Sequence, residues 1–250
     1  MQIESIIATY DPISLEEMDS VKLMNRTDTK YMMSYEELEQ IISQLSDDYR
    51  VLEVNDTRFS SYRSLYFDTP NHDFYYDHHR GKVDRYKVRI RKYVESNLYF
   101  LEIKHKIKGR TDKKRIQLNG FEENLSESSM DFVASVFNFR PQLAPSLWNS
   151  FERITLVNRK LAERMTIDLN LSFEWDGWKR VEKNLVIVEV KQENVNRSSP
   201  FMITAKHALV RPMRMSKYCI GMIHKDDSLK YNNFKPKLLK IQKLDNGLVA

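Results

Sequence analysis

The sequence predicts an α+β protein whose centre is a mostly antiparallel β-barrel of about eight strands, with helices packed outside it. Three long alternating segments, residues 85–94, 98–106 and 110–118, follow one another across short turns. Such turns between alternating segments are typical of an antiparallel meander. Shorter segments rich in β-branched and aromatic residues flank the meander, and so many strands in one chain favour a barrel or a strongly curved sheet.

The remaining elements follow from local signals. Ser34 and Glu37 have the spacing of a capping box, which opens a helix. Pro141 and Pro145 mark a loop that leads into a strand at residue 155. The expected helices are residues 11–24, 35–45, 70–76, 125–139, 201–209 and 214–223. The expected strands are residues 26–33, 51–54, 60–67, 85–94, 98–106, 110–118, 155–158, 164–173 and 185–192.

Length and composition indicate one folded domain. The chain has 250 residues, of which 41% are apolar and 11% aromatic, and this excludes wholesale disorder. We expect a single domain over residues 1–225, followed by a basic tail, residues 226–250, that is either a partner helix or disordered. Neither a membrane-spanning run nor a signal-peptide pattern is present, so we expect a cytoplasmic protein.

Two common kinds of site are excluded by composition. The single cysteine, Cys219, rules out an internal disulfide framework and a cysteine-rich zinc site. The six glycines form neither a Rossmann nor a P-loop motif. His72, His78 and His79 cluster near one expected helix, and we expect them at the surface.

The net charge of +5 is unevenly distributed along the chain. Residues 80–115 contain fourteen basic and four acidic residues, a net charge of +10, so the rest of the chain carries −5. Such a concentration indicates an anionic partner or a strongly asymmetric surface.

The basic residues of this segment fall on one face of each predicted strand. Side chains two residues apart share a face, which places Arg85, Lys87, Arg89 and Arg91 together. The other strands repeat the pattern with Glu102, Lys104 and Lys106; Lys113 and Arg115; Arg164 and Asp168; and Glu189, Lys191 and Glu193.

Two interpretations of these charged faces are open. A single polar strand face is usually a solvated surface. Four cations on one face are less ordinary, because neighbouring like charges repel each other unless an anion lies among them. If the apolar faces pack outward against helices, the charged faces converge in a polar lumen. A lumen rich in Arg and Lys suits a polyphosphate, because guanidinium groups bind phosphate oxygens in a bidentate manner.

Seven short fragments, in order between residues 26 and 218, carry a resemblance to a known family. They are Arg26–Tyr31, Tyr66–Pro70, Lys87–Arg91, Leu101–Lys104, Arg164–Asp168, Val188–Lys191 and Ser216–Tyr218. Together they resemble the triphosphate tunnel metalloenzyme (CYTH-like) superfamily. More narrowly, they resemble the VTC domain, the catalytic polyphosphate polymerase domain of the vacuolar transporter chaperone complex.

The resemblance implies an antiparallel β-tunnel that binds triphosphate and a divalent metal, Mn²⁺ or Mg²⁺, and that is plugged by a terminal helix. The implied reaction is transfer of the γ-phosphate of ATP to a growing inorganic polyphosphate chain. Glu189 is the implied metal ligand. The implied catalytic residues are Arg89, Arg91, Arg164 and Lys217. The implied substrate-binding residues are Lys30, Lys87, Lys104, Arg115 and Arg214, the last one helical turn before Lys217 on the same face.

Two departures from the family pattern bear on these expectations. The hydrolase branch usually opens with Glu-x-Glu-x-Lys, whereas this chain has Arg26-x-Asp28-x-Lys30. This difference favours the polymerase branch and leaves fewer acids for two metals. Arg214 stands where related proteins often have lysine, which keeps phosphate binding but changes its geometry.

Alternative functions stay open beside the polymerase. One is an inorganic triphosphatase or another phosphoanhydride hydrolase of the same superfamily. Another is a non-catalytic module that binds polyphosphate or a nucleotide. A nucleic-acid partner is not expected, because the basic strands lack the interleaved exposed aromatics of single-strand binding platforms. Whether a membrane-protein partner receives the product is left open.

Overall fold

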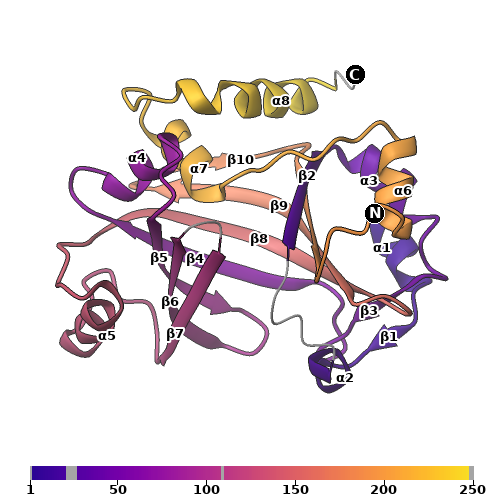
Figure 1. The fold of residues 1–250 in the computed structure, drawn as a ribbon, viewed down its shortest axis with the longest axis horizontal. Helices are drawn as coiled ribbons and strands as arrows, with labels where there is room; N and C mark the ends of the chain where they lie inside the picture. Colours follow the sequence, from indigo (N-terminus) through magenta and orange to yellow (C-terminus); the bar gives the residue numbers. More distant parts are fainter. Residues whose placement is uncertain (1, 21–26, 108–109, 248–250) are drawn as a thin grey trace.

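One continuous sheet organises the chain and curls into a half-barrel (Figure 1). The computed structural model describes residues 2–20, 27–107 and 110–247. The main strands are β2 (Thr27–Met33), β4 (Ser60–Asp68), β5 (Arg85–Tyr93), β6 (Leu98–Ile107), β7 (Arg110–Leu118), β8 (Ala144–Asn158), β9 (Glu163–Trp175) and β11 (Val186–Gln192). They are hydrogen-bonded in the order β2-β11-β9-β8-β4-β5-β6-β7, and every pair is antiparallel. The predicted fold class is therefore confirmed.

Short strands and helices complete the described chain. The strands beside the main path are β1 (Pro12–Ile13), β3 (Tyr49–Leu52) and β10 (Trp178–Val181). The helices are α1 (Gln2–Ala8), α2 (Leu15–Ser20), α3 (Tyr35–Ile42), α4 (Asp73–His79), α5 (Glu127–Phe137), α6 (Pro200–His207), α7 (Lys217–Lys225) and α8 (Lys235–Asp245), with a 3-10 turn η1 (Asn232–Phe234) before α8. In the described part of the chain, none of these helices has the length and apolarity needed to cross a membrane.

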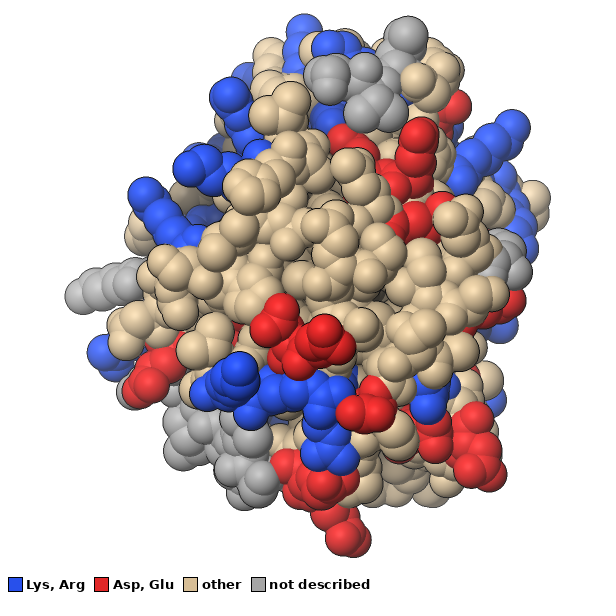
Figure 2. All heavy atoms as spheres, turned by 90° about the vertical axis from the view of Figure 1, so that its right-hand side faces the viewer, with Lys and Arg blue, Asp and Glu red and all other residues tan. Residues whose placement is uncertain are grey.

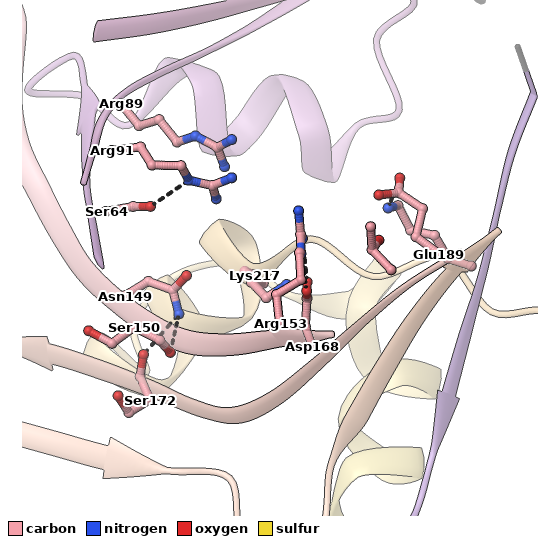
Figure 3. Close-up of polar contacts among 12 residues, drawn as sticks. Ser64, Arg89, Arg91, Asn149, Ser150, Arg153, Asp168, Ser172, Glu189 and Lys217 are labelled. Carbon is pink, nitrogen blue, oxygen red and sulfur yellow. Dashed lines mark hydrogen bonds and ion pairs between the residues drawn. The ribbon is translucent and has the colours of Figure 1, made fainter. Parts of the chain in front are cut away.

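The strand registers gather the alternating charges on one face of the sheet. Arg89 lies opposite Tyr66 on one side and Glu102 on the other, and Glu102 lies opposite Arg115. Residues directly opposite each other in an antiparallel pair share a face. The same registers align Glu189 with Lys30. Because the sheet curls, charged side chains from β5 and from β11, which are four strands apart in the sheet order, point toward a common space on the concave side (Figure 3).

Apolar side chains cover the convex face and hold the sheet in this orientation. On one half, Tyr31, Val188 and Ile167 are buried in a cluster that also contains residues of α1, α3 and α6. On the other half, Leu65 and Val88 are buried together with residues of α5. Burial of apolar surface contributes about 25 cal/mol per Å². The sheet cannot turn its charged face outward without exposing these clusters to water.

The outer surface near α1, α3 and α6 does not carry the positive surplus of the chain. Figure 2 shows this side with a largely uncharged centre and with basic and acidic residues in mixed patches around it. The excess of positive charge therefore lies on other parts of the molecule.

The C-terminal helices close the concave side. Residues Tyr218, Cys219 and Met222 of α7 are buried against Leu147 and Phe173, and α8 adds Ile241 and Leu244 to the same cluster. The C-terminal segment is thus a packed helix up to residue 245, which lies across the top of the view in Figure 1.

Asp68 ties three elements together behind the concave face. Its carboxylate is fully buried and accepts backbone N–H groups of Thr69, Phe74 and Tyr75 at 2.7 to 2.9 Å. It also accepts the hydroxyl of Tyr218 on α7. A short motif after β4 thus sets the start of α4 and the position of α7.

Several sequence-based expectations about elements were wrong. Residues 144–154 belong to β8 and not to a loop. Pro145 is tolerated because it lies next to a register shift opposite Phe67, where the regular ladder is interrupted. The expected helix over residues 11–24 is replaced by β1 and α2, and its last part lies outside the described residues, as does Arg26. Helix α1 was not anticipated.

Gly221 is required by the close approach of α7 to the sheet. A Cβ atom there would lie 2.5 Å from Cδ1 of Phe173 and would also overlap Leu147. We expect Gly221→Ala to lower the free energy of unfolding by about 1–3 kcal/mol, as overpacking does. In an unconstrained helix the same change is stabilising by about 0.5–1 kcal/mol.

Denaturant unfolding of the purified variant tests this expectation. Gly120→Ala is the matched control, because nothing lies within 4 Å of a Cβ built at that position. Equal stability of the two variants would contradict the proposed contact.

Candidate functional site

Side chains from several strands of the sheet and from α7 meet on the concave side. Figure 3 shows Arg89 and Arg91 reaching in from β5, Arg153 from β8, Lys217 from α7 and Glu189 from β11. These residues are far apart in sequence, and the curl of the sheet brings them to one space.

Glu102 anchors one wall of this space. Its carboxylate is fully buried and accepts from Nε and Nη2 of Arg89 at 2.9 and 2.6 Å, and from Nζ of Lys113. Burial favours the neutral acid, but Arg89, Arg91 and Lys113 outweigh it and hold the pKa of Glu102 well below its usual range. One carboxylate therefore serves two cations.

Asp168 has the same role in the centre. Nε and Nη2 of Arg153 donate to its two oxygens at 2.6 and 2.8 Å, and Nζ of Lys217 donates to Oδ2. Burial lowers the pKa of the Lys217 ammonium to about 8, although the Asp168 carboxylate opposes the shift. The ammonium also lies 4.2 Å from the centroid of the Phe151 ring.

Glu189 repeats the arrangement at the far side. Lys30 donates to its Oε1, and Lys191 approaches its Oε2 at 3.0 Å and donates to the hydroxyl of Thr166 at 3.0 Å. Burial lowers the pKa of Lys191 to about 8 despite this carboxylate. Burial would raise the pKa of Glu189, but Lys191 and Lys30 keep it well below its usual range.

Three further cations on this face have no carboxylate within ion-pair distance in the described part of the chain. Arg91 donates to Ser64 at 3.2 Å and Lys87 donates to Ser216 at 3.0 Å. Burial and the charge of Arg89 lower the pKa of Arg91 to about 10. Burial, followed by Arg89 and Arg91, lowers the pKa of Lys104 well below its usual value.

The arrangement is therefore short of negative charge. Glu102, Asp168 and Glu189 are each paired with two cations, and the buried Arg91 and the half-buried Lys87 and Lys104 are left over. Buried unpaired charges are costly, because the protein cannot replace the water that they lose. A ligand with several negative charges would relieve this deficit, which makes the concave face a candidate anion-binding site.

Three predicted residues lie at the margin of the site. Arg115 is exposed on the edge strand β7, where its guanidinium lies 4.5 Å from the centroid of the Phe100 ring. Arg164 is half-buried on the same face as Lys191, which lies opposite it. Arg214 is exposed.

The expected placement of Arg214 was wrong. Helix α7 begins at Lys217 with Ser216 as its N-cap, so Arg214 precedes the helix and is not one turn before Lys217 on the same face. The reason is that the Ser216 hydroxyl accepts the N–H of Cys219, which fixes the start of the helix three residues later than expected.

Arg153 is the site residue that sequence reasoning missed. It was missed because residues before 155 were assigned to a loop. Once β8 is extended back, Phe151, Arg153 and Thr155 alternate on one strand face, and that alternation was the available signal. Lys113 was placed on the correct face but not in the site, since nothing in the sequence pairs it with Glu102.

The donor set does not form a complete metal cage. Among the described residues, no group of three His, Cys, Asp or Glu side chains is suited to hold a metal ion. Magnesium is often bound by one or two carboxylates together with substrate phosphates. The oxygens of Glu189 already face the ammonium groups of Lys30 and Lys191. This carboxylate therefore fits metal binding shared with substrate phosphates and not a metal site formed by protein ligands alone.

The curled antiparallel sheet, with its cation-lined concave face and outer helices, is the tunnel-like architecture that the sequence fragments predicted. The family model described as "VTC domain" matches residues 25–224, which is four-fifths of the chain. The chain therefore belongs to the VTC domain family, as its sequence fragments predicted.

A solved structure agrees on the fold. A protein from Bacillus halodurans described as a suspected adenylate cyclase is similar with a TM-score of 0.53 and 14% identity, over 82% of this chain and 100% of that chain. A Hippeastrum protein, described as an adenylyl cyclase with a dominant triphosphatase activity, has a TM-score of 0.48 and 14% identity, over 84% and 100% of the two chains. A search of curated proteins found no matching relative.

The low pKa of Lys217 gives the site a testable proton linkage. At pH 8 its ammonium is about half protonated, and a bound polyanion favours the charged form. We expect binding of tripolyphosphate at pH 8 to take up protons, and Lys217→Arg to reduce this uptake by up to about half a proton.

Calorimetry in buffers of different ionisation enthalpy measures the uptake. Lys92→Arg on the same strand as Arg91, but on its other face, is the matched control. An unchanged uptake in Lys217→Arg would show that this ammonium does not respond to the anion. Without ligand, the lowered pKa of Lys217 means that stability is highest above the ordinary lysine pKa, falls as the pH drops from there to about 8, and is not changed further by this group below pH 8.

Proposed function

We propose that this protein is a polyphosphate polymerase, which transfers the γ-phosphate of ATP to a growing inorganic polyphosphate chain on the concave face of the sheet. The observation that carries the proposal is the surplus of buried and half-buried cations around Glu102, Asp168 and Glu189. A linear polyphosphate has repeated negative charge along its length, which matches cations contributed by many strands. Membership of the VTC domain family supports the same assignment.

Phosphoryl transfer needs positioning and charge neutralisation more than covalent help from the protein. The terminal oxygen of the acceptor chain is already anionic, so it needs no general base. Its bond to the γ-phosphorus forms while the bond between that phosphorus and the β-γ bridging oxygen breaks, and ADP leaves with the bridging oxygen. No proton has to be removed from the nucleophile.

The residues of the concave face take distinct parts in this step. Arg89, Arg91 and Arg164 stabilise negative charge on the transferring group. Lys217 presents an ammonium beside them, and Asp168 holds it in place. Arg153, rigidly held by the same carboxylate, adds a second fixed cation. Substrate phosphates beyond the reacting group are bound by Lys30, Lys87, Lys104, Arg115 and Arg214.

A divalent ion, Mn²⁺ or Mg²⁺, completes the proposal. When bound, it supplies charge neutralisation on the phosphate oxygens. Glu189 is the residue that would hold it, and Lys30 and Lys191 keep this carboxylate ionised.

The same site with water in place of the acceptor phosphate would act as a triphosphatase. One assay separates the alternatives: purified protein is incubated with ATP and Mn²⁺. A long anionic polymer together with ADP supports the polymerase, phosphate release from tripolyphosphate supports the hydrolase, and binding without turnover indicates a non-catalytic module.

Arg91 offers the sharpest test of the catalytic face. We expect Arg91→Ala to lower turnover at least about 100-fold, as loss of one transition-state donor does, while the fold is retained. Arg63→Ala is the matched control: it removes an arginine from the neighbouring strand β4, where Arg63 is exposed on the opposite face and packs over Trp148.

Initial rates of ADP formation, with thermal unfolding as the check on folding, decide the outcome. Comparable rates for a folded Arg91→Ala and for Arg63→Ala would contradict the proposal that the concave face catalyses the reaction.

Glu189 is tested through the metal. We expect Glu189→Gln to raise the Mn²⁺ concentration needed for half-maximal rate at least about tenfold, because a carboxylate ligand is replaced by a neutral amide. Glu174→Gln, on the other face of β9, is the control. The idea fails if the metal dependence of the two variants is the same.

A further inference from the structure

A second group of cations surrounds a cavity that is separate from the concave face. The cavity has a volume of about 380 Å³ and lies between the C-terminal end of α4 and the segment that leads into α8. Figure 1 shows α4 beside this segment. Its lining residues are Tyr76, His79, Arg80, Lys230, Asn232 and Asn233.

The walls of this cavity are held together by hydrogen bonds. The Asn233 side-chain amide donates to the carbonyl of His79 at 2.7 Å, and the Tyr75 hydroxyl donates to the carbonyl of Lys230 at 3.0 Å. Phe234 is buried beside the rings of Tyr75 and His79. These contacts hold the backbone on both sides of the cavity in place, while the side chains of Arg80 and Lys230 are exposed to solvent.

Its lining contains hydrogen-bond donors and no carboxylate. No ion pair in the described part of the chain involves Arg80 or Lys230, and the Arg80 guanidinium lies 5.7 Å from the centroid of the Tyr76 ring. His79 is buried, contrary to the sequence-based expectation, and its Nε2 accepts the backbone N–H of Asn233 at 3.4 Å. Burial, then Lys230 and Arg80, lower the pKa of this imidazole, so it remains neutral.

We propose that this cavity is a second anion site, which binds a small oligophosphate of two or more phosphoryl groups. A guanidinium and an ammonium without acidic partners, with two asparagine amides and a tyrosine hydroxyl beside them, match phosphate oxygens in charge and in hydrogen bonding. The volume falls in the range of about 300–1,000 Å³ typical of small-molecule sites.

Helix α4, which lines this cavity, also lies close to cations of the sheet. His78, next to His79 on α4, is half-buried, and partial burial followed by the charges of Lys87, Arg85 and Lys106 lowers its pKa. Residues of α4 thus line the cavity and also lie near cations of β5 and β6. The proposal does not rest on the polymerase activity, because Arg80 and Lys230 are not among the residues assigned to catalysis.

Calorimetric titration with sodium pyrophosphate at about 0.15 M salt, where non-specific attraction is screened, tests the proposal. We expect two sites in the wild-type protein and one in Arg80→Gln/Lys230→Gln. An Arg89→Ala/Arg91→Ala variant, weakened on the concave face, is expected to keep the other site. When Arg80→Gln and Lys230→Gln are added to Arg89→Ala/Arg91→Ala, the affinity of the cavity beside α4 for pyrophosphate should fall at least about tenfold, as loss of charge-assisted hydrogen bonds does.

Lys235→Gln/Lys237→Gln is the matched control, because it removes two positive charges close to the cavity but outside its lining. Wild-type stoichiometry in Arg80→Gln/Lys230→Gln would overturn the proposal, and so would equal weakening by the control. If the Arg89→Ala/Arg91→Ala variant does not fold, the number of pyrophosphate sites in Arg80→Gln/Lys230→Gln and in Lys235→Gln/Lys237→Gln, each compared with wild type, still tests the proposal.

ATP is the second probe. Binding of ATP to the Arg89→Ala/Arg91→Ala variant with an affinity similar to that of pyrophosphate supports recognition of the phosphate chain. Binding of ATP without binding of pyrophosphate would overturn the proposal, because the nucleoside would then be the recognised group. Loss of turnover in Arg91→Ala reports on the concave face alone. The proposed polymerase activity and the proposed second anion site can therefore be disproved independently of each other.

Discussion

The structure depends on one electrostatic constraint: more cations than anions lie together, buried or half-buried, on the concave face of a single sheet. Three carboxylates, Glu102, Asp168 and Glu189, each hold two cations in place. Without these carboxylates the like charges would repel one another at close range in a poorly solvated space. With them, the side chains are held in defined positions and the face still lacks negative charge. Rigidity and affinity for polyanions thus come from the same contacts.

Burial of the apolar layers offsets the free-energy cost of gathering these charges on one face. Helices α1, α3, α5 and α6 bury the convex face, and α7 seals part of the concave face through Gly221, Tyr218 and Met222. The residues that follow β4 connect these layers, because Asp68 binds the start of α4 and the hydroxyl of Tyr218 at once. Helix α4 is therefore in contact with both the sheet and the closing helix, and it also forms one wall of the second cation-lined cavity.

Predictions from the sequence succeeded where one strand carries its own signal. The meander β5-β6-β7 has strict alternation and short turns, so its boundaries and its charged face could be derived residue by residue. Strand β8 has mixed polarity on both faces and a proline near its start, so it was mistaken for a loop and Arg153 was lost with it. The start of α7 depends on a single cap at Ser216, and a shift of three residues was enough to misplace Arg214.

The amino-acid sequence by itself determined the fold class, the family and the faces on which the charges lie, because side-chain alternation and turn chemistry are local properties of the chain. Only the tertiary structure decided which cation meets which carboxylate. Arg153 and Lys217 share Asp168 although they come from a strand and a helix more than sixty residues apart, and the cavity beside α4 is formed by segments even further separated. Such pairings depend on strand register and on the curl of the sheet, and no local pattern in the sequence encodes either of them.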